Sequence, residues 1–472
     1  MIFNKNRYNN NMPQPEETKT QKSYFALLLL ALTALIIIRV LPILKSPLST
    51  YGYDFGFYSY AANHTGAFHF ADLFNNAVWG GYNNPIFLIG SWLRLPSQLL
   101  VSELYFLASV ALGLACFSWM KLKSPLAGIF ACLLLATSFV QTSGYLMYLW
   151  KNIVALPLLV LGFKFLEEKK YWQLAICFLA VLLLHRTTAI LFGLALGIYF
   201  IIETIKQKKW RLLSTCAAVA ILFGVAGYFA LHLKSIILNL IYNNNYYVTT
   251  GLFMEGTNFW RVWWPFLLLA LPGLYLFIKK RQHPILSIFT VVLLVWIVFK
   301  FPFYRRMLLY LDLCLIVYAA YFLSLVDYSR KFMKAALGII IAVLLIRSAD
   351  FALSQTPLIS SANVAEIKNF HPAGGFGFIL AVSANDAPWL LAYANPAARL
   401  GAPGLLEDPH TYQQWKDFWQ GQNQRTFLSY YPRPLYFYQR SYRLPPFGAS
   451  QCLTPLTQNF SQLDYGCLEK TP

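Results

Sequence analysis

The chain has 472 residues, of which 58% are hydrophobic and only 12% are charged. A soluble domain usually carries about twice that charged fraction, so the composition excludes an ordinary soluble protein. Many apolar runs approach the ~20 residues that a helix needs to cross a bilayer, and they are continuous rather than alternating, which excludes a membrane β-barrel. The chain is therefore predicted to be an α-helical polytopic membrane protein.

The formal net charge of +19 is unevenly distributed along the chain. Residues 1–350 hold 30 Lys and Arg against 12 Asp and Glu, a balance of +18, whereas residues 351–472 hold 8 against 7. Basic residues between apolar runs are typical of cytoplasmic loops and of contacts with anionic lipids. The charge therefore indicates membrane lipids as partners and argues against nucleic acid.

The chain begins with a polar segment, residues 1–22, which is rich in Asn, Gln and Lys and is predicted to be disordered and cytoplasmic. The first apolar run, at about 24–44, is too long for the core of a signal peptide and predicts the first membrane helix. Residues 45–97 are aromatic, rich in Gly and Asn, and only partly apolar. We expect them to form a long outer loop at the membrane surface with short interfacial helices.

Further apolar runs complete a membrane module over residues 23–351, with about eleven membrane helices in all. The count includes a split at His185–Arg186, a polar break inside an apolar stretch. With the N-terminus inside, every inside loop then carries Lys or Arg, in agreement with the positive-inside rule, and the long first loop and the tail lie outside. The ten later helices are expected at about 98–119, 125–146, 150–166, 171–184, 187–204, 212–233, 262–279, 284–300, 303–325 and 334–351.

The tail, residues 352–472, has the mixed composition of a soluble domain and is predicted to form an extracytoplasmic α/β or α+β domain. Phe376–Val382 is typical of a buried strand, and Glu407–Gly421 is typical of a short amphipathic helix. Cys452 and Cys467 lie in this tail. In an oxidising compartment they either pair as a disulfide or remain free, and the sequence does not decide between the two.

Five basic residues lie on the predicted outer side, which should be poor in positive charge, and each lies at or near a helix end. Any one of them, taken alone, is explained as an anchor whose charge reaches the membrane surface. Five on one side suggest a site for an anionic ligand, and a lipid phosphate is the natural candidate. These residues are Lys151, Arg186, Arg261, Arg305 and Arg306.

Asp54 is the strongest candidate among the few acidic residues of the outer face. It lies ten residues after the first apolar run, and Tyr58 would share its face on a helix because the two are four positions apart. A carboxylate at the membrane surface can accept a proton from an acceptor hydroxyl and activate it for attack. The alternative is that Asp54 caps a surface helix over Phe55–Asn63. Asp72 is either a second carboxylate of the site or, as we favour, a loop or capping residue.

Other candidates have structural explanations of similar weight. His185 either contacts phosphate together with Arg186 or is a satisfied histidine at a helix junction. The adjacent Arg305 and Arg306 suit a phosphate or pyrophosphate better than a bilayer anchor requires. Tyr82, in a segment dense in turn formers, either shapes a sugar pocket or only connects two helices. Glu255 lies in a loop whose Trp and Tyr residues more commonly form an interfacial belt than a sugar site.

Four short motifs, in this order and on this side of the membrane, resemble the GT-C superfamily of membrane glycosyltransferases. That group includes protein O-mannosyltransferases and the lipid A aminoarabinose transferase. The resemblance covers about residues 20–350. The matching segments are Tyr53-Asp-Phe-Gly-Phe-Tyr58, Tyr82-Asn-Asn-Pro-Ile86, His185-Arg-Thr-Thr188 and Tyr304-Arg-Arg-Met307.

The resemblance implies a cell-membrane enzyme that transfers a sugar, with inversion, from a polyprenyl-phosphate donor to a hydroxyl of a lipid, glycan or protein acceptor. Asp54 would be the base, and Arg305, Arg306 and Arg186 would meet the lipid phosphate. Many relatives carry adjacent acidic residues in the first loop, whereas Asp54 is followed by Phe55, and many polyprenyl-phosphate enzymes work without a metal. We therefore expect no metal and no cofactor. Two alternatives are a polyprenyl-pyrophosphate glycan polymerase or ligase, and a non-catalytic transporter or assembly factor.

Overall fold

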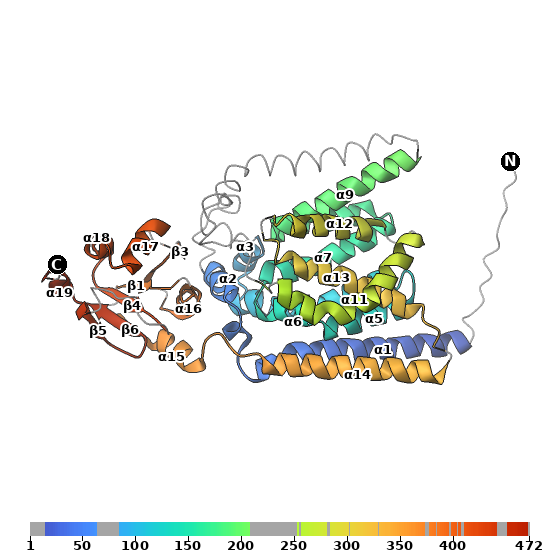
Figure 1. Cartoon of the computed structure of the whole chain (residues 1–472), viewed down its shortest axis with the longest axis horizontal. Helices are drawn as coiled ribbons and strands as arrows, with labels where there is room; N and C mark the ends of the chain where they lie inside the picture. Colours follow the sequence, from blue (N-terminus) through green and yellow to red (C-terminus); the bar gives the residue numbers. More distant parts are fainter. Residues whose placement is uncertain are drawn as a thin grey trace.

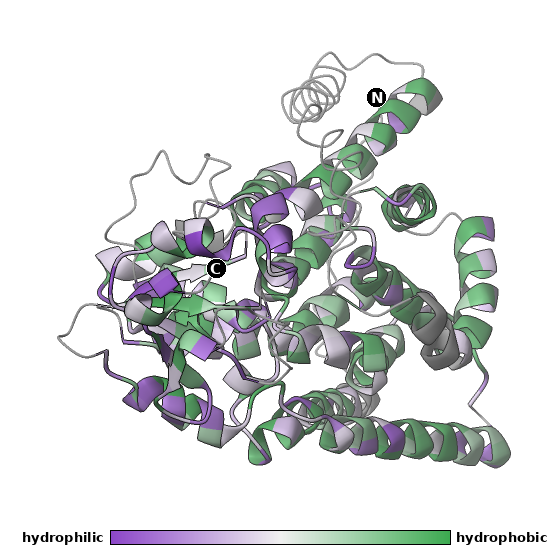
Figure 2. Ribbon diagram, turned by 60° about the vertical axis from the view of Figure 1, so that its left-hand side comes forward, coloured by the Kyte–Doolittle hydropathy of each residue, from purple (hydrophilic) through white to green (hydrophobic). Residues whose placement is uncertain are grey.

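The computed structural model describes most of the chain and shows a large group of helices joined to a smaller part built on a sheet (Figure 1). Figure 2 shows mainly hydrophobic residues along the long helices and a more mixed colouring around the sheet. The described residues are 15–63, 85–207, 253, 256–280, 284–301, 303–328, 330–372, 377–383, 385–395, 398–403, 405–406, 410–440 and 451–470.

The helical part follows the predicted order of apolar runs. Short helical elements in the first loop are η2 (Leu48–Thr50), α2 (Asp54–Asn63) and α3 (Pro85–Trp92). On either side of it, η1 (Leu41–Leu44) ends the first apolar span and the π-helical turn η5 (Leu99–Glu103) begins the second. The longer helices are α1 (Pro15–Val40), α4 (Leu104–Met120), α5 (Pro125–Thr137), α6 (Phe139–Leu146), α7 (Trp150–Glu167), α8 (Tyr171–Leu184), α9 (Arg186–Gln207), α11 (Gly256–Lys279), α12 (Pro284–Val298), α13 (Met307–Ser324) and α14 (Lys331–Ser354).

Within the described ranges, five helices are long and apolar enough to cross a membrane. The bent pair of α5 and α6 would make a sixth span, and α8, α12 and residues 266–279 of α11 are shorter apolar helices. The predicted helix at 212–233 lies outside the described residues, so the total of eleven stays a prediction. The predicted split is confirmed, because α8 ends at Leu184 and α9 begins at Arg186.

The membrane helix predicted at 125–146 is present as a bent pair of helices instead of one straight helix. Its two halves, α5 and α6, meet at an angle of 57°. Ser138, between them, has an extended backbone, and its hydroxyl accepts a hydrogen bond from the Gln141 N–H at 3.1 Å. That bond caps α6 and satisfies an amide that a helix start would leave unpaired, so the chain can turn here.

The helices differ in how they are covered. Within α13, 89% of the apolar stretch is buried, whereas in α14 the share is 11%. Figure 1 shows α14 beside α1 along one side of the group. Apolar residues that remain uncovered over a whole helix are expected to face lipid, while a helix buried on all sides forms the centre of the module. α13 therefore serves as the central element that other helices surround.

The smaller part contains a six-stranded mixed sheet in the order β3-β2-β1-β4-β6-β5. β1 pairs in parallel with both β2 and β4, and the outer pairs are antiparallel. The predicted strand at 376–382 is confirmed as β1, with residue 376 outside the described residues. The strands are β1 (Phe378–Ala381), β2 (Arg399–Ala402), β3 (Leu405–Leu406), β4 (Leu435–Tyr438), β5 (Leu453–Pro455) and β6 (Phe460–Leu463).

Helices cover both faces of this sheet. Successive residues of β1 point to opposite faces, so each face has its own buried cluster. Ile379 belongs to one buried cluster, and Phe378 belongs to the other. The first cluster includes α15 (Ser361–Asn369) and α16 (Ala387–Tyr393), and the second includes α17 (Tyr412–Trp419) and α18 (Gln424–Ser429). α17 is the predicted amphipathic helix, and it starts at a capping box of Thr411 and Gln414. The domain is of the predicted α/β type.

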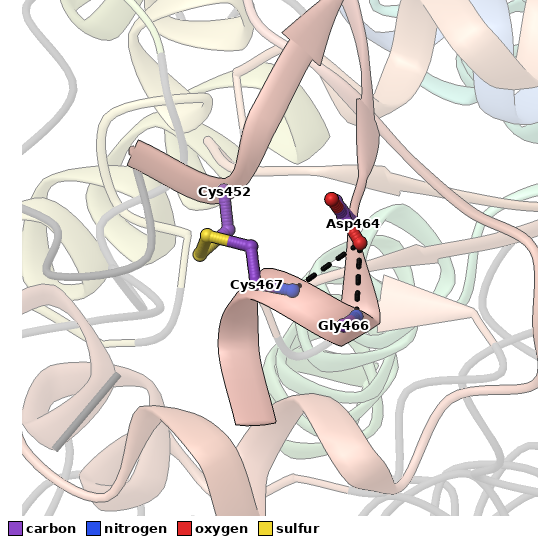
Figure 3. Close-up of a disulfide and its surroundings, with 4 residues drawn as sticks. All are labelled: Cys452, Asp464, Gly466 and Cys467. Carbon is purple, nitrogen blue, oxygen red and sulfur yellow. Dashed lines mark hydrogen bonds between the residues drawn. A yellow bond between two sulfur atoms is a disulfide. The ribbon is translucent and has the colours of Figure 1, made fainter. Parts of the chain in front are cut away.

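A disulfide joins Cys452, at the start of β5, to Cys467 in α19 (Tyr465–Lys470), with the two Cα atoms 5.3 Å apart (Figure 3). The Asp464 carboxylate accepts hydrogen bonds from the Gly466 N–H at 2.9 Å and the Cys467 N–H at 3.3 Å. These bonds satisfy the first amides of α19. The pairing that the sequence left open is present, and it fastens the last helix to the edge of the sheet.

Candidate active site

An ion pair joins the first loop to the late membrane helices. Asp54 is the first residue of α2, and Arg306 immediately precedes α13. The Arg306 Nη2 atom donates to the Asp54 Oδ2 atom at 3.1 Å, across 252 residues of sequence. The two side chains are only 14% and 19% exposed for Asp54 and Arg306, respectively. Two residues that the sequence nominated separately therefore form one partly buried pair.

More positive charge surrounds this pair. Lys151, in the first turn of α7, interacts electrostatically with Asp54, Arg306 and Arg186. His185, between α8 and α9, lies within electrostatic range of Lys151 and Arg306. Asp54 thus lies near Arg306 and Lys151, and His185 and Arg186 interact electrostatically with Lys151, so basic side chains from three separate parts of the chain gather around one carboxylate. Such an excess of positive charge in a partly buried place favours an anionic ligand.

A chain of hydrogen bonds supports the site from beneath. The Tyr310 hydroxyl, in α13, accepts a hydrogen bond from the Asn152 amide at 3.1 Å and bonds to the Thr188 hydroxyl. The Thr188 hydroxyl in turn lies 2.5 Å from the His185 Nδ1 atom. These contacts tie α7, α9 and α13 together and hold the His185 ring in place. Sequence reasoning missed Tyr310 and Asn152, whose only signal is a polar group within an apolar helix.

The environment of Asp54 changes its acidity. Burial raises the pKa of the Asp54 carboxyl above its usual value, while the charges of Arg306 and Lys151 act in the opposite direction. Cations beside a buried carboxylate favour its ionised form. Its raised pKa makes it a better proton acceptor than an exposed aspartate. The group therefore has the properties that a general base needs.

Tyr58 lies one turn after Asp54 and is buried. Its ring packs against Trp150 at 5.6 Å and Phe87 at 6.3 Å between centroids. Trp150 directly precedes Lys151, so this aromatic group forms a wall next to the cations. Tyr58 is placed here as part of that wall.

The remaining candidates are placed as follows. Tyr304 and Arg305 are half-buried in the turn before α13, where Phe303 has a left-handed backbone with φ 61°. Arg186 is half-buried at the start of α9. Arg261 lies in α11, but its side chain is outside the described structure. Asp72, Tyr82 and Glu255 also lie outside the described residues, so their roles stay predictions.

An apolar groove lies beside the aromatic wall. Its volume is about 310 Å³, and it is formed by α3, η5 and α4. Phe87, in the same helix α3, contacts Trp150 at 5.1 Å between ring centroids. Helix α3 therefore contributes both to the groove and to the aromatic wall that precedes Lys151. Its lining consists of Ile86, Ile89, Gly90, Leu95, Leu99, Leu100, Leu104 and Leu107.

Comparison with known proteins gives a likeness in structure and none in sequence. No protein-family model and no curated protein sequence matches the chain. The crystal structure of the Archaeoglobus fulgidus oligosaccharyltransferase, a complex with Zn and sulfate, is similar at a TM-score of 0.53 and 12% identity. The likeness covers 87% of this chain and 68% of that one. The chain has a GT-C-like fold. It is an α-helical polytopic membrane protein with a C-terminal α/β domain.

Nowhere in the described ranges do three or more His, Cys, Asp or Glu side chains gather in a group that would hold a metal ion. The partners of Asp54 are Arg306 and Lys151, which compete with a cation rather than helping to bind one.

Proposed function

We propose that the chain is an inverting glycosyltransferase that moves a sugar from a polyprenyl-phosphate donor to a hydroxyl acceptor at the outer membrane surface. The observation that carries the proposal is the partly buried Asp54–Arg306 pair, with Lys151 and His185 around it. A carboxylate and several basic side chains lie in one place, which is the combination that a base and a phosphate site for this reaction would need.

The donor combines a phosphate with a long hydrocarbon chain, and the site has a counterpart for each part. Arg306 and Lys151 would pair with the phosphate. The groove of Ile86 and its neighbours would hold the first isoprene units, because its lining is almost entirely apolar. The contact of Phe87, in the same helix as part of the groove, with Trp150, which directly precedes Lys151, supports one amphiphilic ligand that spans groove and cations.

The reaction follows from these positions. Asp54 takes the proton of the acceptor hydroxyl, and the oxygen attacks the anomeric carbon as the bond from that carbon to the phosphate oxygen breaks. The bonding electrons leave with the phosphate, and Arg306 and Lys151 stabilise its charge. The products are a glycoside of inverted configuration and the polyprenyl phosphate. When the phosphate binds Arg306, it competes with Asp54 for the guanidinium. Arg306 then lowers the pKa of Asp54 less, so the effect of burial prevails and the carboxylate becomes more basic.

The proposed topology places the N-terminus in the cytoplasm and the sheet domain, residues 352–472, outside the cell membrane. Basic inside loops support this arrangement. The Cys452–Cys467 disulfide supports it as well, since disulfides persist in oxidising compartments. The site then opens to the outer leaflet, where a lipid-linked donor can enter from the bilayer.

A second candidate is transfer of a preassembled glycan from a polyprenyl-pyrophosphate carrier. It is favoured by the structural neighbour, whose name specifies an oligosaccharyltransferase. The adjacent Arg305 and Arg306 would suit the additional phosphate of such a donor. The two candidates differ in the donor and share Asp54 as the base.

The deciding experiment uses purified protein reconstituted in lipid, with radiolabelled polyprenyl-phosphate sugars and polyprenyl-pyrophosphate glycans as two donor panels. We expect turnover of the first panel and a loss of about a hundredfold or more in Asp54→Asn. Asp350→Asn, at an exposed position of α14, is the matched control and should retain full turnover. Turnover of the second panel alone would select the second candidate, and turnover unaffected by Asp54→Asn would exclude Asp54 as the base.

A further inference from the structure

We infer that Gly52 and Gly56 are positioning residues that hold α2 between the membrane module and the sheet domain, and so place Asp54 against Arg306. Each glycine lies two positions from Asp54, one on either side. The inference rests on the proposed function for the chemistry of Asp54. Its physical basis is the close approach of two backbones to α2.

Gly52 makes the contact on the membrane side. A Cβ atom at this position would lie 2.4 Å from the Tyr148 Cβ and 2.6 Å from the Met147 carbonyl carbon. Those residues form the turn between α6 and α7, three residues before Lys151. Only a residue without a side chain can bring the start of α2 this close to the turn that leads to Lys151.

The Met147–Tyr148 turn has little room to retreat. Tyr148 has a left-handed backbone with φ 60°, which is uncommon for a residue with a side chain. It is fully buried, its hydroxyl donates to the Val101 carbonyl oxygen at 2.7 Å, and its ring stacks on Tyr105 at 4.6 Å. Such a conformation persists only where the surroundings hold it firmly. The membrane side of the contact is therefore rigid.

Gly56 makes the contact on the other side. A Cβ atom here would lie 1.7 Å from the carbonyl oxygen of Pro388, which is in the first turn of α16. Because the obstructing atom belongs to the backbone, no change of side-chain rotamer can relieve the overlap. α16 is itself fixed, since Trp389 is fully buried and its ring lies 5.7 Å from that of Tyr53.

α2 also contributes side chains to two separate cores. Phe57 belongs to the buried cluster of the sheet domain, together with Trp389. Phe55 and Tyr58 belong to the large buried cluster of the membrane helices. Figure 1 accordingly shows α2 and α16 where the two parts of the molecule meet. The helix that carries Asp54 thus packs against the sheet domain on one of its sides.

This arrangement has a consequence for Asp54. A side chain at Gly56 must push α2 away from α16, because neither backbone can yield locally. The Asp54–Arg306 contact, at 3.1 Å, has little tolerance for such a shift. A misplacement of about 1 Å in a reacting group can cost roughly a hundredfold in rate. Gly56→Ala should therefore separate the pair and slow turnover by at least about tenfold.

The test measures the pair without relying on activity. Melting temperatures are determined for Asp54→Asn, Arg306→Gln and the double variant, each in the wild-type, Gly56→Ala and Gly338→Ala backgrounds. Gly338, in α14, is the matched control because nothing lies within 4 Å of a Cβ atom built there. We expect the two substitutions to be non-additive in the wild type and in Gly338→Ala, which shows a direct interaction, and additive in Gly56→Ala.

Turnover of the donor panels is then measured for the same proteins, with a large loss expected in Gly56→Ala and none in Gly338→Ala. If Gly56→Ala does not fold, Phe57→Ala loosens the same face without an overlap and should give the same pattern. Non-additivity that survives in Gly56→Ala, no interaction in the wild type, or unchanged turnover in Gly56→Ala would each overturn the inference. If no donor is turned over by the wild type, the proposed function fails, while loss of the interaction in Gly56→Ala still supports the positioning.

Discussion

Replacement of Arg306 by Gln tests the central ion pair directly. At 3.1 Å between the Arg306 Nη2 and the Asp54 Oδ2, the attraction is about 5 kcal/mol at an effective dielectric constant near 20. Both side chains keep some exposure, so solvent screens part of this attraction, and desolvation offsets more of it. We therefore expect Arg306→Gln to lower the free energy of unfolding by about 1–3 kcal/mol at neutral pH.

The loss of free energy of unfolding in Arg306→Gln should depend on pH. The direction of this dependence follows from the pKa of Asp54. Burial raises that pKa, and Arg306 opposes the rise, so without the guanidinium the pKa moves further upward. A group with a raised folded pKa contributes its full stability below the unfolded value, about 3.9, and loses it as pH rises through the folded value. The destabilisation by Arg306→Gln should be full near pH 8 and shrink toward about pH 4.

The assay is unfolding of the reconstituted protein across this pH range. Arg305→Gln, in the same turn, is the control and should show a smaller loss without this pH dependence. The double variant Asp54→Asn/Arg306→Gln removes the titrating group and should be insensitive to pH in the same window. A loss from Arg306→Gln that is equal at both ends of the range, or equal to that of Arg305→Gln, would refute this reasoning.

Three further predictions concern other parts of the molecule. Ile89→Trp, which fills the apolar groove, should raise the KM for the lipid donor about tenfold with little change in kcat, whereas Ile339→Trp on the exposed face of α14 should change neither. Cys467→Ser, which removes the disulfide, should lower the free energy of unfolding of the sheet domain by about 2–4 kcal/mol in a denaturant titration; an unchanged midpoint would contradict this. Burial raises the pKa of Asp386, and Arg440 opposes the rise, so Arg440→Gln should destabilise the sheet domain more at neutral than at acid pH, and a pH-independent loss would argue against the pair.

The helices and the general nature of the site could be predicted because they depend on local signals. Continuous apolar runs define the membrane helices, and the charge of the loops was sufficient to divide the stretch at His185. Arg306 was nominated because a positive charge on the outer side of the membrane is informative by itself, and Asp54 because acidic residues are few on that side and it lies shortly after the first apolar run. Their pairing was not predictable, because 252 residues separate them and only the folded chain brings them together.

Other features have no local signal that distinguishes them. Gly56 has no feature in the sequence that marks it, because the atom that leaves no room for a side chain there is the carbonyl oxygen of Pro388, more than 300 residues later. Tyr310 looked like one more aromatic residue of an apolar helix, although its hydroxyl links α7 and α9. The break at Ser138 follows from a hydroxyl that caps α6, and a serine within an apolar run is too common to indicate it. Close approach and buried hydrogen bonding depend on the partner, which a single sequence does not show.

The buried polar residues beneath the site explain why a break in a membrane helix is tolerated there. Asp312, fully buried in α13, accepts hydrogen bonds from Ser138 at 2.8 Å and from Gln141 at 3.0 Å. Arg39 of α1 donates to Thr142 at 2.6 Å and interacts electrostatically with Asp312. A carboxylate in an apolar interior is expensive unless it is paired and hydrogen-bonded, and the break supplies the donors that it needs.

The position of this network relates it to the chemistry above. Asp312 lies six residues after Arg306 on the same stretch of chain, and α6 leads within a few residues to Lys151. By fixing α6 against α13, the network sets the spacing of the two cations that face Asp54. The site is therefore held from three directions: by the polar network beneath it, by the Met147–Tyr148 turn beside it, and by the sheet domain through Pro388. Asp54, the first residue of α2, lies between Gly52 and Gly56, the two glycines through which the last two of these supports act.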